Sequence, residues 1–164
     1  MACLYGRTNF IDYIRSDYPE QFNGLLYKFD YEGLNPIHTA YYAGESEIID
    51  YLLRIDSRLN EVLTKDNQTV LHIAAGYGHY NLVRKTINDH HEFLSKCDDE
   101  GYTPLHSAIY GGEVAVVQYL MDNYYQLIRD TTGTTIEGLL ELASYYHPEL
   151  EEILQAPLVG VTED

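Results

Sequence analysis

The chain has 164 residues, 45% of them hydrophobic, and a net charge of −16 from 26 acidic and 10 basic side chains. This hydrophobic content excludes a chain disordered by composition, and the length suffices for one continuous core. The negative charge argues against nucleic acid and membrane partners, because phosphates and anionic lipids would be repelled, and it favours a protein or peptide with basic residues.

Signals for targeting and for disulfide bonds are absent from the sequence. No apolar run approaches the ~18 residues of a membrane span, and no basic region precedes an apolar stretch at the N-terminus. The two cysteines, Cys3 and Cys97, are too far apart in the pattern to form a framework. We therefore expect a cytoplasmic protein, with the nucleus, or the host cytosol for a pathogen protein, left open.

The N-terminal segment 1–29 predicts an irregular unit. Several of its small and apolar residues match positions further along the chain. Ala2 matches Ala40, Gly6 matches Gly44, and Phe10-Ile11 matches Ile48-Ile49. A stretch from Ser16 to Asp30 holds a short insertion and several apolar side chains. We expect that stretch to pack on the rest of the molecule rather than to form a bare loop.

One phrase then recurs at a constant interval, over residues 36–44, 70–78 and 104–112. Asn or Thr, which cap helix N-termini, precedes each phrase, and Pro opens two of them. Each phrase ends in a glycine, Gly44, Gly78 or Gly112, suited to the left-handed backbone that terminates a helix. Each phrase therefore predicts a short helix.

A second helix is expected after each glycine, from amphipathic spacing that begins at Ile48-Ile49, Leu82-Val83 and Val116-Val117. A turn precedes each phrase. Gly33, Asn67 and Gly101 occupy the matched position in these turns, and Asn is the residue type that best tolerates positive φ after Gly.

A period of about 33 residues built on Thr-Pro-Leu-His-x-Ala is typical of ankyrin repeats, which this chain resembles. The resemblance implies an all-α solenoid of stacked helix-turn-helix units with β-turn fingers. It implies one domain, residues 1–155, with approximate repeats at 1–29, 30–63, 64–97, 98–131 and 132–155, and a flexible acidic tail at 156–164. It also implies that His38, His72 and His106 are structural, bonding backbone across the turn.

The last repeat departs from the pattern. Asp130-Thr-Thr-Gly133 predicts a turn, residues 136–154 predict a helix pair, and Pro148 could start the second helix. The register slips slightly, and Tyr146 or His147 stands where the repeat glycine would be. Residues 130–164 contain eight carboxylates and no Lys or Arg, which predicts a solvated face and leaves open attraction of a basic partner.

Catalytic motifs are missing. The sequence has no Gly-x-Ser-x-Gly, no phosphate-binding loop and no zinc-protease helix. Adjacent His90 and His91 would point about 100° apart on a helix and chelate poorly. We expect no enzyme activity, no metal and no cofactor.

The 17 tyrosines, in a chain without Trp, supply the strongest functional signal. In ankyrin-repeat proteins the end of the first helix and the turn tips line a concave groove, and tyrosine recurs there in every repeat. Tyrosine is favoured at recognition surfaces because it is large, rather rigid and amphipathic. The candidate partner-binding residues are Tyr31, Glu32, Tyr42, Asp66, Gln68, Tyr77, Asp99, Glu100, Tyr102, Tyr110 and Tyr145.

We therefore expect a monomeric protein-interaction module acting as adaptor, inhibitor or effector. The alternative is an ankyrin scaffold segment of a larger channel, scaffold or effector enzyme. Compositional drift toward tyrosine is the competing explanation for the aromatic pattern.

Overall fold

The computed structural model describes residues 8–156, and in this range all regular secondary structure is helical. The α-helices are α1 (Thr8–Asp17), α2 (Pro19–Leu26), α3 (Pro36–Ala43), α4 (Ser46–Ile55), α5 (Val70–Gly76), α6 (Tyr80–Asp89), α7 (Pro104–Tyr110), α8 (Val114–Thr132), α9 (Ile136–Tyr146) and α10 (Glu151–Gln155). Three 3-10 helices, η2 (Ser57–Glu61), η3 (His91–Ser95) and η4 (Pro148–Leu150), lie between them.

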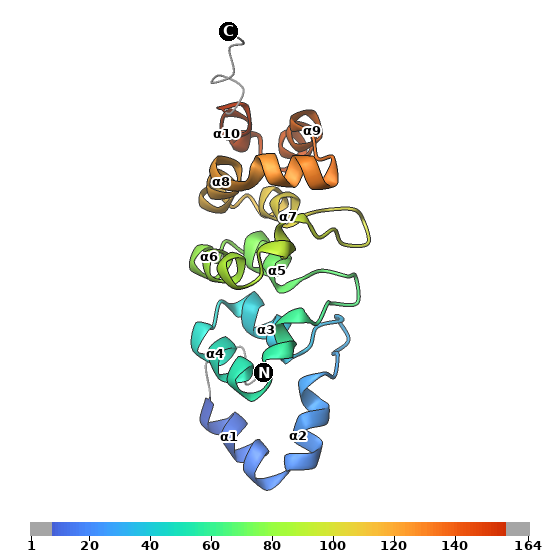
Figure 1. The fold of residues 1–164 in the computed structure, drawn as a ribbon, viewed down its shortest axis with the longest axis vertical. Coiled ribbons are helices and arrows are strands. Elements are labelled where there is room, and N and C mark those ends of the chain that lie inside the picture. The colour runs from blue at the N-terminus through green and yellow to red at the C-terminus, as the bar shows by residue number, and fades with distance from the viewer. Residues whose placement is uncertain (1–7, 157–164) are drawn as a thin grey trace.

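The helices form two columns along an elongated stack (Figure 1). One column contains α3, α5, α7 and α9, which we call the inner helices, and the other contains α4, α6, α8 and α10. Three long turns project from the side of the inner helices. The all-α stack of helix-turn-helix units with fingers is therefore confirmed.

The inner helices begin and end as their residue types predict. Asn35 caps α3: its side chain accepts a hydrogen bond from the main-chain N–H of His38, and the His38 ring accepts one from that of Asn35. Thr69 and Thr103 make the same reciprocal capping box with His72 and His106. The repeat glycines Gly44, Gly78 and Gly112 have φ of 71°, 69° and 72°, the left-handed region in which a side chain is strained.

The core runs the length of the stack and is built from the same positions in successive repeats. Leu71 and Leu105 are fully buried on α5 and α7, and Ile48-Ile49 and Val116-Val117 are buried on the other column. The backbones at the ends of α5 and α7 come very close to each other. A Cβ atom on Gly111 would collide with the main-chain carbonyl of Gly76. The two central repeats therefore pack with direct backbone-to-backbone contact.

The extra residues near the N-terminus form a helix rather than a loop. Phe22 and Leu26 of α2 are buried against the stack, as expected, whereas Leu25 and Tyr27 remain exposed. The Tyr27 hydroxyl donates to the Asp56 carboxylate over 2.6 Å, which ties the end of α2 to the following repeat. The proposed matches at Ala2 and Gly6, and the thiol of Cys3, lie outside the described residues.

The C-terminal repeat differs from the prediction at its start. The expected turn at 130–132 is wrong: these residues are the last turn of α8, which crosses toward the finger side of the stack (Figure 1), and the chain reverses at Gly133 with φ of 74°. Helix α9 begins early, but Leu139 is buried as its counterpart Leu105 is in the preceding repeat. The slip is thus confined to the helix start. As expected, Pro148 starts the second helical segment.

Candidate partner-binding face

The three fingers are rigid turns linked to one another. Asp30 and Asp98 each close a finger by accepting main-chain N–H groups two and four residues ahead, over 2.8–3.0 Å. Neighbouring fingers are joined by main-chain hydrogen bonds from Lys65 to Gly33 and from Asp99 to Asp66, at 3.3 and 3.1 Å. The three fingers therefore form one continuous ribbon of backbone along the edge of the stack.

The candidate residues on the fingers divide by what they contact. Tyr31 is 92% exposed, and Glu32, Asp66 and Glu100 also face solvent. Two other candidates join fingers to each other: Gln68 donates to Asp98 over 3.4 Å, and Asp99 accepts from Asn67 over 2.6 Å. Asn67 has φ of 59°, so it fills the glycine position of its finger as predicted.

The repeated histidines lie beneath the fingers and pin them to the inner helices. His38 Nε2 donates to the carbonyl of Val62 over 2.8 Å, and His72 Nε2 donates to that of Tyr102 over 3.0 Å. Burial lowers the pKa of His38, His72 and His106, which keeps the rings neutral and their Nδ1 atoms free to accept. Within residues 8–156, no group of His, Cys, Asp and Glu is arranged to hold a metal ion.

Exposed tyrosines at the C-terminal ends of the inner helices form what we call the tyrosine ladder: Tyr42, Tyr77, Tyr110, Tyr145 and Tyr146. The rings of Tyr42 and Tyr77 lie 4.3 Å apart, and those of Tyr110 and Tyr146 lie 4.7 Å apart. Tyr145 packs on Tyr146 at 4.6 Å and is itself 80% exposed. Each ring therefore supports a neighbour while keeping part of its surface open.

The ladder and the fingers belong to one electrostatic environment. Burial raises the pKa of Tyr77, and its neighbours Tyr42, Glu32 and Tyr110 raise it further. Burial likewise raises the pKa of Tyr146, followed by the influence of Tyr110, Tyr145, Tyr102 and Glu100. The carboxylates of Glu32 and Glu100, both exposed on the fingers, are thus among the groups that raise the pKa values of the ladder tyrosines.

A second row of residues borders the ladder and was missed in the sequence. Each packs against the glycine of the preceding repeat: His79 on Gly44, Glu113 on Gly78 and His147 on Gly112. His79 and Glu113 directly follow a repeat glycine, whereas His147 follows Tyr146. The Nε2 atom of His79 also donates to the main-chain carbonyl of Tyr42 over 2.9 Å. The constant spacing of these three positions, equal to that of the repeat, was the signal that could have revealed them.

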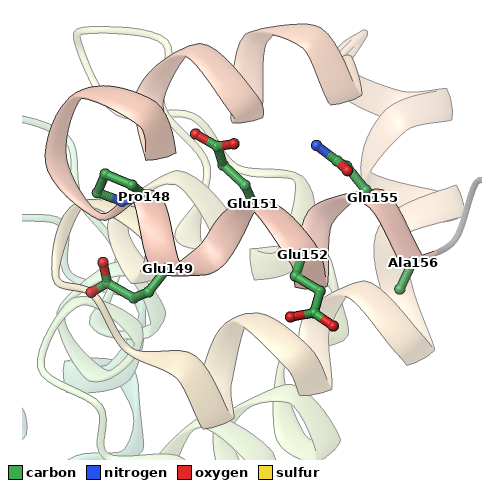
Figure 2. A pocket seen from close by; sticks show the side chains of 6 residues that line it. All are labelled: Pro148, Glu149, Glu151, Glu152, Gln155 and Ala156. Atoms are coloured by element: carbon green, nitrogen blue, oxygen red, sulfur yellow. The ribbon is translucent and has the colours of Figure 1, made fainter.

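One hollow at the C-terminal end of the stack is lined by Pro148, Glu149, Glu151, Glu152, Gln155 and Ala156. Figure 2 shows the carboxylates of Glu151 and Glu152 on opposite sides of α10, so they do not converge on one point. Cys97 is exposed, and within residues 8–156 it forms no disulfide bond. In residues 8–156, none of the helices combines the length and hydrophobicity needed to cross a bilayer.

Comparison with known proteins agrees with this geometry. Residues 55–132 match the family described as ankyrin repeats in three copies. The chain is 30% identical over 118 residues to the human transient receptor potential cation channel subfamily A member 1, covering 71% of this chain and 10% of that protein. It is 33% identical over 84 residues to alpha-latrotoxin-Lhe1a of Latrodectus hesperus, covering 51% of this chain and 6% of the toxin.

Protein ACCELERATED CELL DEATH 6 of Arabidopsis thaliana is 30% identical over 96 residues, which is 58% of this chain and 14% of that protein. The chain thus spans only a small part of the length of these relatives, 6% to 14%. The matched region carries the phrase, the capping boxes and the left-handed glycines described above. The chain is an ankyrin-repeat protein.

Proposed function

We propose that the chain is a non-catalytic binding module whose tyrosine ladder and finger tips hold a protein or peptide partner. The tyrosine ladder carries this proposal, because exposed aromatic rings recur along one side of the stack in successive repeats. Such rings supply large contact area at small conformational cost, and a few of them dominate the affinity of typical interfaces. Proteins are the usual partners of ankyrin repeats, which supports this class of ligand.

The finger carboxylates set the chemistry of the partner. Glu32 and Glu100 act on the ladder tyrosines, and Asp66 lies exposed on the finger between them. These carboxylates would steer a basic segment onto the face and raise its association rate, while the tyrosines supply most of the affinity. The role of adaptor, inhibitor or effector in the cytoplasm, nucleus or a host cytosol belongs to this proposal.

Affinity capture with ladder variants tests the proposal. The immobilised chain and its Tyr42→Ala/Tyr110→Ala variant are exposed to the same lysate, with helicity checked by circular dichroism. A Tyr13→Ala/Tyr18→Ala variant is the matched control, because it removes two exposed tyrosines that are not in the ladder. We expect the ladder variant alone to lose its partners, and higher salt to weaken the wild-type complex. Equal loss in both double variants would overturn the assignment to this face.

A second candidate function is an ankyrin scaffold segment of a longer protein. It is favoured by the comparisons, in which the chain corresponds to a short stretch of a channel and of toxins. The coding sequence that flanks Met1 tests it. Continuous in-frame coding upstream would support the scaffold segment, and a stop codon would favour a separate small protein.

A further inference from the structure

The tyrosine ladder is interrupted at its centre. Tyr42 pairs with Tyr77 and Tyr110 pairs with Tyr146, but among the described residues no ring contact joins Tyr77 to Tyr110. The position equivalent to Tyr42 and Tyr110 in the middle repeat is Gly76, which has no side chain to bridge the two pairs. Tyr77 and Tyr110 are 51% and 59% exposed, so each presents free ring surface beside this interruption.

The same place contains two hydrogen-bond acceptors without a donor in the described part of the chain. In the preceding repeat, His79 donates to the carbonyl of Tyr42. At the equivalent positions one repeat later, Glu113 replaces the histidine and Gly76 supplies the carbonyl. A carboxylate cannot donate, and within residues 8–156 neither the Gly76 carbonyl nor the Glu113 side chain receives a hydrogen bond.

Both acceptors lie close to Gly111. A Cβ atom added to Gly111 would collide with the Gly76 carbonyl oxygen and would lie 3.2 Å from Cγ of Glu113. The Glu113 carboxylate itself packs against Gly78, directly after Tyr77. The interruption therefore combines two aromatic rings, one main-chain carbonyl and one carboxylate, all of which favour a cation with several N–H donors.

The following inference rests on the proposed function. We propose that the partner inserts an arginine side chain between Tyr77 and Tyr110, where its guanidinium donates to the Gly76 carbonyl and the Glu113 carboxylate. Arginine fits better than lysine, because the planar guanidinium can stack on aromatic rings and still direct N–H groups to two acceptors at once. It would supply the donor that His79 provides in the preceding repeat.

Peptide titration tests the site without a known partner. The probes are acetyl-Gly-Gly-Arg-Gly-Gly-amide and its lysine and citrulline analogues, added to the ¹⁵N-labelled chain in low salt. We expect the arginine peptide to shift the amide signals of residues 76–78 and 110–113 and to bind several-fold more tightly than the lysine peptide. The neutral citrulline peptide should not bind measurably. Uniform shifts over all acidic surfaces with either cation would overturn the site.

Two variants separate this site from general charge attraction. Glu113→Gln removes the charge, and Glu113→His supplies an internal donor to the Gly76 carbonyl; both should weaken arginine binding by about fivefold or more, as expected on losing a charge-assisted hydrogen bond. Glu141→Gln removes an exposed carboxylate from α9 and should leave the affinity unchanged. Full binding by Glu113→His, or equal loss in Glu141→Gln, would contradict the proposal.

The two proposals can fail separately. If a captured protein depends on the ladder tyrosines but binds Glu113→His at full affinity, the proposed function stands and the arginine site is wrong. If the arginine peptide binds as expected and no captured protein depends on the ladder, the arginine site stands and the proposed function is wrong.

Discussion

His79 joins two repeats through one hydrogen bond, from its Nε2 atom to the main-chain carbonyl of Tyr42, with an N···O distance of 2.9 Å. The same ring packs against Gly44, where a Cβ atom would collide with it. Tyr42 in turn contacts Tyr77, two residues before His79. The bond thus holds the end of α3 in the position that pairs the first two rings of the ladder.

Replacing His79 by alanine should lower the free energy of unfolding by about 1 kcal/mol, the typical net value of one hydrogen bond. The midpoint of urea unfolding should fall while its slope stays constant, because the compactness of either state is not expected to change. Asn88→Ala, at an exposed position of the helix that follows His79, is the control. An unchanged midpoint for His79→Ala would show that this bond contributes nothing to stability.

Two glycines at the contact between α5 and α7 should respond oppositely to alanine. Gly111→Ala should destabilise the protein by about 1–3 kcal/mol, because its Cβ atom would collide with the Gly76 carbonyl and the backbones would have to separate. Gly76→Ala should be neutral or stabilising by up to about 1 kcal/mol, since its Cβ atom would lie 3.4 Å from the Ser107 carbonyl and it ends a helix. Thermal unfolding of the two variants checks this difference; equal effects would contradict it.

Stability should fall as the pH is lowered from about 7 toward 5. Burial lowers the pKa of His38, His72 and His106 in the folded state, so the unfolded chain binds more protons in this range and acid favours unfolding. The contribution of these histidines is fully present above the ordinary histidine pKa of about 6.5 and is lost below it.

The ring protons of these histidines report the effect directly by NMR. The signals of His38 and His72 should titrate at a lower pH than the signal of a histidine in a short reference peptide, whose pKa is about 6.5. Titration of either signal together with the peptide would refute the prediction.

The third finger should depend on Asp98. Its carboxylate accepts the main-chain N–H groups of Glu100 and Tyr102, and Asp98→Ala should cost about 1–2 kcal/mol by leaving both without this partner. Asp98→Asn keeps an acceptor oxygen and should lose less. Hydrogen exchange at these two amides provides the measurement: it should accelerate strongly in the alanine variant, and unchanged exchange would exclude the capping role.

Most of the stack could be predicted because its determinants are local. Thr103 caps its helix, Gly112 follows the end of the first helix of its repeat and His72 bonds across a turn, and each does so through residues within one or two repeats. The phrase contains these interactions, so its regular recurrence was enough to predict the helix pairs and the positive φ at Asn67.

The departures have a local cause in α8 and a cause between repeats in the tyrosine ladder. Nothing local stops α8 at Asp130, because Thr131 and Thr132 bond back to carbonyls of the preceding turn and the helix continues to Gly133. The paired rings of the ladder and the position of Glu113 depend on residues from two repeats, which no single phrase contains. The ladder tyrosines were nevertheless foreseeable, since their positions recur.

The extension of α8 ends the row of fingers. In the place where a fourth finger would follow the other three, the chain continues as helix to Thr132 and turns directly into α9. The finger ribbon therefore ends at residues 98–102, and a segment that binds along it meets a helix rather than another turn. An extended segment that followed the proposed binding face over three fingers would therefore have a defined last contact at residues 98–102.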